Sequence, residues 1–194
     1  MVYSGKHFAE AFRTVRKNTL QIAEEIPEDK YSFKATPDVM TVGEDLAHLA
    51  AFTRWPQTVH GAQRKAAFVF GEFQGLMDDM MKFQGSLKTK AQIVEALRTE
   101  GDSFAAFLEG LSDDLLSEMV SFPPEAQQGA KSRFEMLLGV KEHEMHHRAK
   151  LMVAQRLLGM VPHLTRRRQE TMAARAAAAP AAAGAGAAAA ARPN

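Results

Sequence analysis

Residues 133–158 read RFEMLLGVKEHEMHHRAKLMVAQRLL, and this stretch decides the fold. Apolar residues such as Val140 and Leu151 belong to a series with steps of three and four, which is the period of one face of an α-helix. Ser132, with a glutamate three residues later, has the form of a capping box, and Gly159 is a stop signal. The pattern predicts one long amphipathic helix.

Three earlier segments show the same helical periodicity, over residues 6–26, 41–59 and 89–110. Thr41 and Thr89 each begin a capping box immediately before an apolar run. No segment has the alternating apolar pattern of a half-buried strand. The sequence therefore predicts an all-α fold, an antiparallel four-helix bundle.

The domain boundary is expected where the composition changes. Residues 1–162 hold the four periodic segments and form one domain, in which the glycine-containing stretch 60–85 is expected to supply only short helical pieces and a mobile connection. Residues 163–194 are basic at first and then almost wholly alanine, with no face to bury. We expect this C-terminal tail to be disordered.

Charge and cysteine content exclude several classes of function. Lys and Arg total 24 against 23 Asp and Glu, so the net charge of +1 provides no field that would attract nucleic acid or an anionic membrane. Without cysteine, His, Asp and Glu remain as ligands for a transition metal. The chain also lacks an apolar run of about 20 residues and an N-terminal signal sequence, which predicts a cytoplasmic protein.

Three histidines lie on apolar helix faces. His143 and His147 are four residues apart on the stripe of the last helix, and His48 lies in line with Phe52 and Trp55 in the second. Buried imidazoles need partners, and one divalent ion satisfies three of them at once. Each histidine taken alone is also compatible with a core residue bonded to a carbonyl or carboxylate. The remaining candidates near segment ends are expected at the surface or in loops: His7, His60 and His163.

The last helix also contains a competing motif. Residues 143–147, HEMHH, satisfy H-E-x-x-H, in which Glu144 would be the general base of a zinc metalloprotease. The extended form of that signature needs a glycine and a further histidine, but Lys150 and Val153 occupy those places. A protease is therefore a minor alternative.

Two further residues flank the histidine of the second helix. Asp45 lies three residues before His48 and can orient its second ring nitrogen, although a first-turn acid also interacts favourably with the helix dipole. Trp55, seven residues after His48, is a candidate pocket wall or a plain core residue. Glu144 is the candidate general base of the site.

Three stretches carry a resemblance to a known family. They are TVGEDLAHLA at residues 41–50, HEMHHR at 143–148, and RLLG at 156–159 with Pro162 after it. Together they resemble the DinB/YfiT-like superfamily of small helical bundles, which is distinct from the DNA polymerase that shares the name DinB. The resemblance covers residues 6 to 162.

The resemblance implies a divalent ion, Ni, Zn, Mn or Fe, held by His48, His143 and His147. It also implies a homodimer and a small-molecule substrate such as a low-molecular-weight thiol, since some members resemble thiol S-transferases or mycothiol-dependent isomerases. Lys150 departs from the family, where many relatives carry Gln. The expected function is a metal-dependent hydrolase or thiol S-transferase. The alternative is a non-catalytic, stress-associated metal-binding dimer.

Overall fold

A computed structural model describes residues 3–69, 71–127 and 129–178. The chain divides into two compact units, one ending at Pro162 and one beginning at His163. The second unit contains α8 (His163–Ala178). In chain order the elements of the first unit are α1 (Gly5–Glu25), the 3-10 turn η1 (Glu28–Lys30), α2 (Val42–Phe52), α3 (Arg54–Pro56), the π-helical segment η2 (Gln57–Ala62), α4 (Glu72–Ser86), α5 (Lys90–Glu109), α6 (Asp113–Ser117), β1 (Met119–Ser121), the 3-10 turn η3 (Pro124–Ala126), β2 (Ala130–Ser132) and α7 (Arg133–Leu157).

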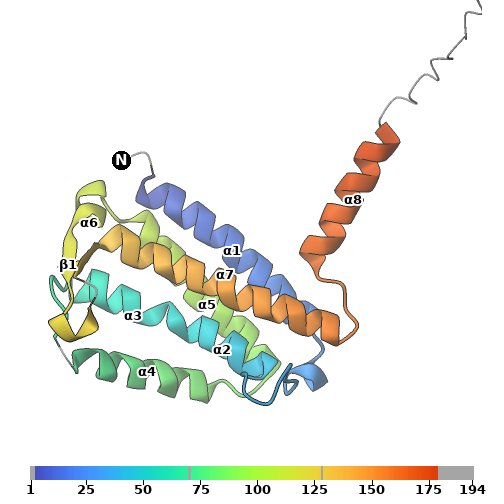
Figure 1. The fold of residues 1–194 in the computed structure, drawn as a ribbon, viewed down its shortest axis with the longest axis horizontal. Helices are drawn as coiled ribbons and strands as arrows, with labels where there is room; N and C mark the ends of the chain where they lie inside the picture. Colours follow the sequence, from blue (N-terminus) through green and yellow to red (C-terminus); the bar gives the residue numbers. More distant parts are fainter. Residues whose placement is uncertain (1–2, 70, 128, 179–194) are drawn as a thin grey trace, which may run out of the picture. The chain divides into compact units, whose positions relative to one another are not determined.

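The first unit is a four-helix bundle, as the sequence predicts. Helices α1 and α7 run in one direction and α2 and α5 in the other (Figure 1). Each of α1 and α2 packs against both α5 and α7, so the consecutive helices α1 and α2 lie diagonally across the bundle. This order places α2 beside α7, which are the two helices that carry the candidate ligands.

The predicted helix starts agree with the structure. Thr41, Thr89 and Ser132 each accept a hydrogen bond from the backbone N–H three residues later, and the residue at that position returns a bond to the cap. Each box satisfies two of the N–H groups that a helix start leaves without partners. Local sequence therefore fixes where α2, α5 and α7 begin.

The core of the bundle consists of two apolar clusters, one toward each end. Ile22, Leu46 and Leu97 are fully buried in the first, together with Leu151. Phe8, Phe12 and Phe104 are fully buried in the second, with Leu108 and Leu137. A buried phenylalanine contributes about 3–5 kcal/mol relative to alanine. The core therefore holds all four helices along their length.

The stretch 60–85 differs from the prediction. It contains the regular 15-residue helix α4, which packs outside the bundle against α2. Gly75 and Gly85 within α4 lower its intrinsic helix propensity, and this obscured it in the sequence. Pro56 lacks a backbone N–H and was expected to kink or restart the helix predicted over 41–59. The structure agrees, because this helix is interrupted at Thr53 and continues as a π-helical segment after Pro56.

Two further elements depart from the expectations. A short antiparallel hairpin pairs β1 with β2 and leads directly into α7, where no strand was predicted. Residues 163–178, expected to be disordered, form α8, because alanine and arginine both favour helix. The alanine-rich remainder of the tail, residues 179–194, lies outside the described residues. Across the described residues, no helix has the length and apolar character needed to cross a membrane.

Candidate metal centre

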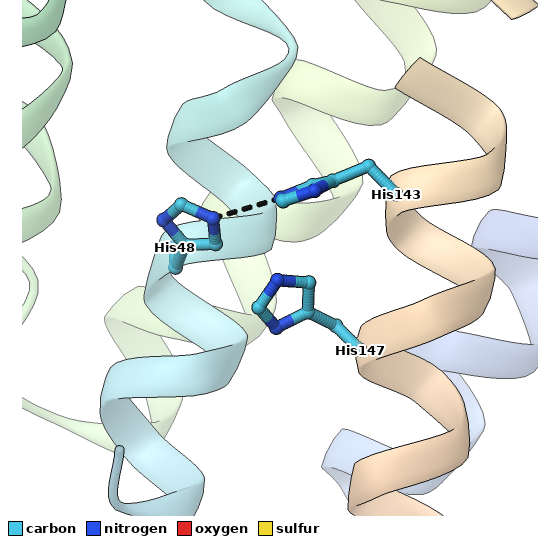
Figure 2. Close-up of side chains that lie close together, drawn as sticks. All are labelled: His48, His143 and His147. Carbon is cyan, nitrogen blue, oxygen red and sulfur yellow. Dashed lines mark hydrogen bonds between the residues drawn. The ribbon is translucent and has the colours of Figure 1, made fainter. Parts of the chain in front are cut away.

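The structure brings together the three predicted ligands. His48 projects from α2 toward His143 and His147 of α7 (Figure 2). One ring nitrogen from each lies within 4.8 Å of the other two. The Nε2 atoms of His48 and His143 are 2.8 Å apart and share a hydrogen bond. The i, i+4 spacing on α7 and the packing of α2 against α7 produce this arrangement.

The surroundings favour uncharged rings at neutral pH. Burial, followed by the neighbouring rings of His147 and His48, lowers the pKa of His143 to about 4. Burial likewise lowers the pKa of His48, with His147 as the next cause. Neutral imidazole is the form that binds a metal ion. His48 and His143 are therefore ready to coordinate without first losing a proton.

The outward nitrogens of two rings are occupied by oxygen atoms. Nδ1 of His147 is hydrogen-bonded to Oδ1 of the buried Asp45, and Nζ of Lys150 lies 3.3 Å from the same oxygen. Nδ1 of His48 lies 3.3 Å from Oε1 of Gln84 in α4. An Nδ1–H that donates to oxygen leaves the Nε2 lone pair free for a ligand. These contacts turn Nε2 of both rings toward the site.

The expected partner of Asp45 was wrong. Asp45 was expected to orient His48, three residues along the same helix, but it reaches across to His147 on α7 instead. Nδ1 of His48 instead contacts Oε1 of Gln84, and this contact was not predicted because α4 was not expected as a regular helix. Both contacts join residues of different helices, so the periodicity of a single helix does not predict them.

An aromatic series extends from the histidines along α2 and α3. The Phe52 ring stacks on His143 with centroids 3.8 Å apart and an interplanar angle of 21°. Trp55 packs edge-on against Phe52 at 5.9 Å. Trp55 is half-buried, and it contributes both to the core and to cavity walls. Phe52 therefore shields one side of the histidine group.

Glu144 is placed away from the three histidines. Its carboxylate is 2% exposed and accepts three hydrogen bonds from the Arg16 guanidinium of α1, at 2.9 to 3.1 Å. Arg16 also donates to the backbone carbonyls of Leu97 and Leu49, at 2.7 and 3.1 Å. Both carboxylate oxygens are thus engaged on the α1 side of α7. The predicted general base is therefore held in a buried ion pair with Arg16.

The remaining histidines depart in part from expectation. His60 was expected at the surface but is 1% exposed on η2, and its Nδ1 accepts a hydrogen bond from Nη1 of Arg133 at 3.2 Å. Burial, together with the positive charge of Arg133, lowers the pKa of His60 to about 4. His163 is also buried rather than exposed. His7 takes part in the N-terminal cap of α1.

The donor set fits a divalent transition metal. Three uncharged nitrogen ligands suit nickel, zinc, manganese or iron. Bonds of about 2.0–2.1 Å require the most distant pair of nitrogens to approach by on the order of 1 Å. Within the described part of the chain, His48, His143 and His147 form a group with no fourth His, Asp or Glu in it.

Comparison with known proteins gives the family. Residues 11–151 match the sequence pattern of the DinB superfamily. The chain belongs to the DinB superfamily. Comparison with curated protein sequences gives no significant match.

Solved structures agree with the fold of this DinB superfamily protein. A DinB-like protein from Bacillus subtilis superposes with a TM-score of 0.59 and 21% identity, over 79% of this chain and 92% of that chain. YfiT from Bacillus subtilis, described as a probable metal-dependent hydrolase with an unusual four-helix bundle topology, gives 0.59 and 14%, over 80% and 88%. A mycothiol-dependent maleylpyruvate isomerase gives 0.56 and 11%, over 74% and 58%. These identities establish a shared fold.

Proposed function

We propose that this DinB superfamily protein is a metal-dependent enzyme of the hydrolase or thiol S-transferase class. The observation that carries the proposal is the group of His48, His143 and His147, with one nitrogen from each within 4.8 Å of the others. A structural metal site is closed by protein ligands, whereas a catalytic site keeps a position open. Similar folds described as a metal-dependent hydrolase and a mycothiol-dependent isomerase support the same class.

The chain's own residues define what such a site can do. A divalent ion bound there supplies a Lewis acid that lowers the pKa of water or of a thiol in the open position. Asp45 holds His147 in one tautomer, and Gln84 does the same for His48. Since the sequence has no cysteine, a thiol nucleophile must come from a small molecule.

The protease alternative loses its general base. H-E-x-x-H chemistry needs the glutamate beside the reacting water, within about 2.6–3.2 Å of the proton it removes. Glu144 instead pairs with Arg16 and is 2% exposed. In the function proposed here, Glu144 therefore takes no part in proton transfer.

A second candidate function is a non-catalytic metal-binding homodimer. The outer surface of α7 exposes Met145, Val153 and Leu157 at 40, 53 and 60% of their areas, at steps of eight and four residues. Exposed apolar residues gathered on one helix favour a contact with another molecule. We propose that a second copy of the chain covers this surface. Val153→Glu should then convert dimer to monomer in light scattering, while Met119→Glu, equally exposed on β1, should not.

Elemental analysis of untagged protein tests the metal site. We expect near-stoichiometric nickel, zinc, manganese or iron in the parent and loss of that metal in His48→Ala and His143→Ala. His146→Ala is the matched control, because His146 is exposed and lies outside the group. Metal that persists in both ligand variants, or a parent that binds none after reconstitution, would reject the site. Turnover of thiol-transfer or ester substrates by metal-loaded protein, with none by metal-free protein, would then favour the enzyme over the non-catalytic dimer.

A further inference from the structure

A cavity of about 670 Å³ lies between the first turns of α4 and α7. Trp55 of α3 forms part of its wall, and so do Gly139 and Met136 of α7. This volume is within the range of about 300–1,000 Å³ that small-molecule sites occupy. The cavity is therefore large enough for the body of a substrate.

The cavity wall contains three aromatic rings, those of Trp55, Phe68 and Phe122, and its polar lining residues are Gln74, Lys131 and Glu135. Phe68 and Phe122 are stacked with centroids 5.3 Å apart and an interplanar angle of 19°. Backbone hydrogen bonds hold this wall, because Phe68 N–H donates to the Ser121 carbonyl and Ser121 N–H donates to the Ala66 carbonyl. Stacked or edge-on contacts with a planar ring add to the gain from apolar burial. The chemistry of the walls favours an aromatic ring.

The cavity lies within reach of the proposed ligands. Gly139 precedes His143 by four residues on α7, which is about 6 Å along the helix axis. Trp55 follows His48 by seven residues, and Phe52 lies between them in contact with both Trp55 and His143. One helical turn of α7 thus separates the cavity wall from His143, and the Phe52 ring lies between Trp55 and His143.

We propose that this cavity is an aromatic-binding subsite, which holds the ring of a substrate whose reacting group lies at His48, His143 and His147. The position of the reacting group rests on the proposed function, whereas ring binding depends on the cavity alone. The substrate class is an aryl compound with a thiol, ester or similar group about 6–10 Å from the ring.

A glycine in the cavity wall provides a test that preserves the fold. A Cβ added at Gly139 would meet no atom within 4 Å, and the residue lies inside α7, so leucine fits there and favours helix. Gly139→Leu therefore adds an apolar side chain at the cavity wall without removing any contact. Gly75→Leu is the matched control, because Gly75 is also helical with open space around its Cβ but is not among the residues that line this cavity.

Trp55 is the single tryptophan of the sequence, so it reports ring binding without any need for metal or turnover. The first probe is 8-anilinonaphthalene-1-sulfonate, measured by energy transfer from Trp55 in metal-free and nickel-loaded protein. We expect binding that weakens about tenfold or more in Gly139→Leu and stays unchanged in Gly75→Leu. No binding to the parent, or equal binding by Gly139→Leu, would overturn the proposal.

The second arm compares 4-phenylbutane-1-thiol with butane-1-thiol on nickel-loaded protein, followed by thiolate–metal absorption. The phenyl thiol should bind about tenfold more tightly, and Gly139→Leu should remove this difference. Equal affinities in the parent would reject the aromatic subsite while supporting the metal site. If neither thiol gives the absorption but the naphthalene probe still depends on Gly139, the proposed function fails and the aromatic subsite is supported.

Discussion

Replacing Glu144 with glutamine removes the negative charge from a buried ion pair and keeps the volume of the side chain. Arg16 and Glu144 are 4% and 2% exposed, and the carboxylate provides the counter-charge to this buried guanidinium. The same guanidinium bonds the carbonyls of Leu49 and Leu97. Arg16 of α1 therefore contacts α2, α5 and α7 at once. Leaving the Arg16 charge without its counter-charge should therefore destabilise the whole bundle.

The expected loss of stability in Glu144→Gln follows from these contacts. Breaking a buried pair by removing one partner costs about 3–5 kcal/mol. An amide oxygen can still accept one of the three bonds from Arg16, so we expect the lower end, about 3 kcal/mol. For a chain of this length the melting temperature should fall by roughly 6–12 °C. Exposed Glu142 on the same helix offers a control, since Glu142→Gln should change the free energy of unfolding by less than about 0.5 kcal/mol.

Urea unfolding and calorimetry measure these changes, and a double variant identifies their cause. Arg16→Met combined with Glu144→Met removes both charges, so it should be more stable than Glu144→Gln, because no unpaired charge remains in the core. Folded Glu144→Gln should also keep its metal, since Glu144 is not in the histidine group. A loss below about 1 kcal/mol in Glu144→Gln, or a double variant no better than the single one, would refute this account.

Three further predictions concern single side chains. Asp45→Asn should weaken metal binding about 10- to 100-fold by competition with a chelator, because His147 loses the carboxylate on its Nδ1; unchanged affinity would contradict this. The pKa of His60 is lowered to about 4 in the native state. Below about pH 6.5 the unfolded chain therefore binds a proton at His60 that the native state does not bind. The free energy of unfolding should therefore fall by up to about 3 kcal/mol from pH 6.5 to 4, and His60→Asn should reduce that slope in urea titrations. Thr41→Ala should cost about 1 kcal/mol in thermal unfolding, because the Glu44 N–H loses its acceptor.

The sequence predicts most of the fold because its signals are local. The apolar stripe of α7 and the caps at Thr41, Thr89 and Ser132 each depend on residues within one or two turns. The helix that was missed, α4, lies outside the bundle and has glycines within it, so it shows neither strong propensity nor a clear buried face. Its stability comes from packing against α2, which periodicity does not reveal.

The candidate site could be predicted only as far as helix faces allow. Periodicity places His143 and His147 on one stripe and His48 on another, and the bundle brings the two stripes together. The partner of Asp45 and the contact from Gln84 depend on side-chain directions between different helices. The bond between Arg16 and Glu144 joins residues 128 positions apart, and no local pattern connects them. Such contacts between side chains of different helices can be identified only from the three-dimensional arrangement of the helices.

The motif at residues 143–147 has two faces with separate roles. Neighbouring residues on a helix differ in direction by about 100°, so Glu144 cannot share the face of the histidines on either side of it. The histidines face α2, whereas Glu144 faces α1 and bonds Arg16, which in turn bonds the carbonyl of Leu49, the neighbour of His48. One guanidinium thus links the residue after His143 to the residue after His48. This buried ion pair thus joins α7 to α1 and α2 from a face of α7 that the histidines do not occupy, and it supports a structural role for Glu144.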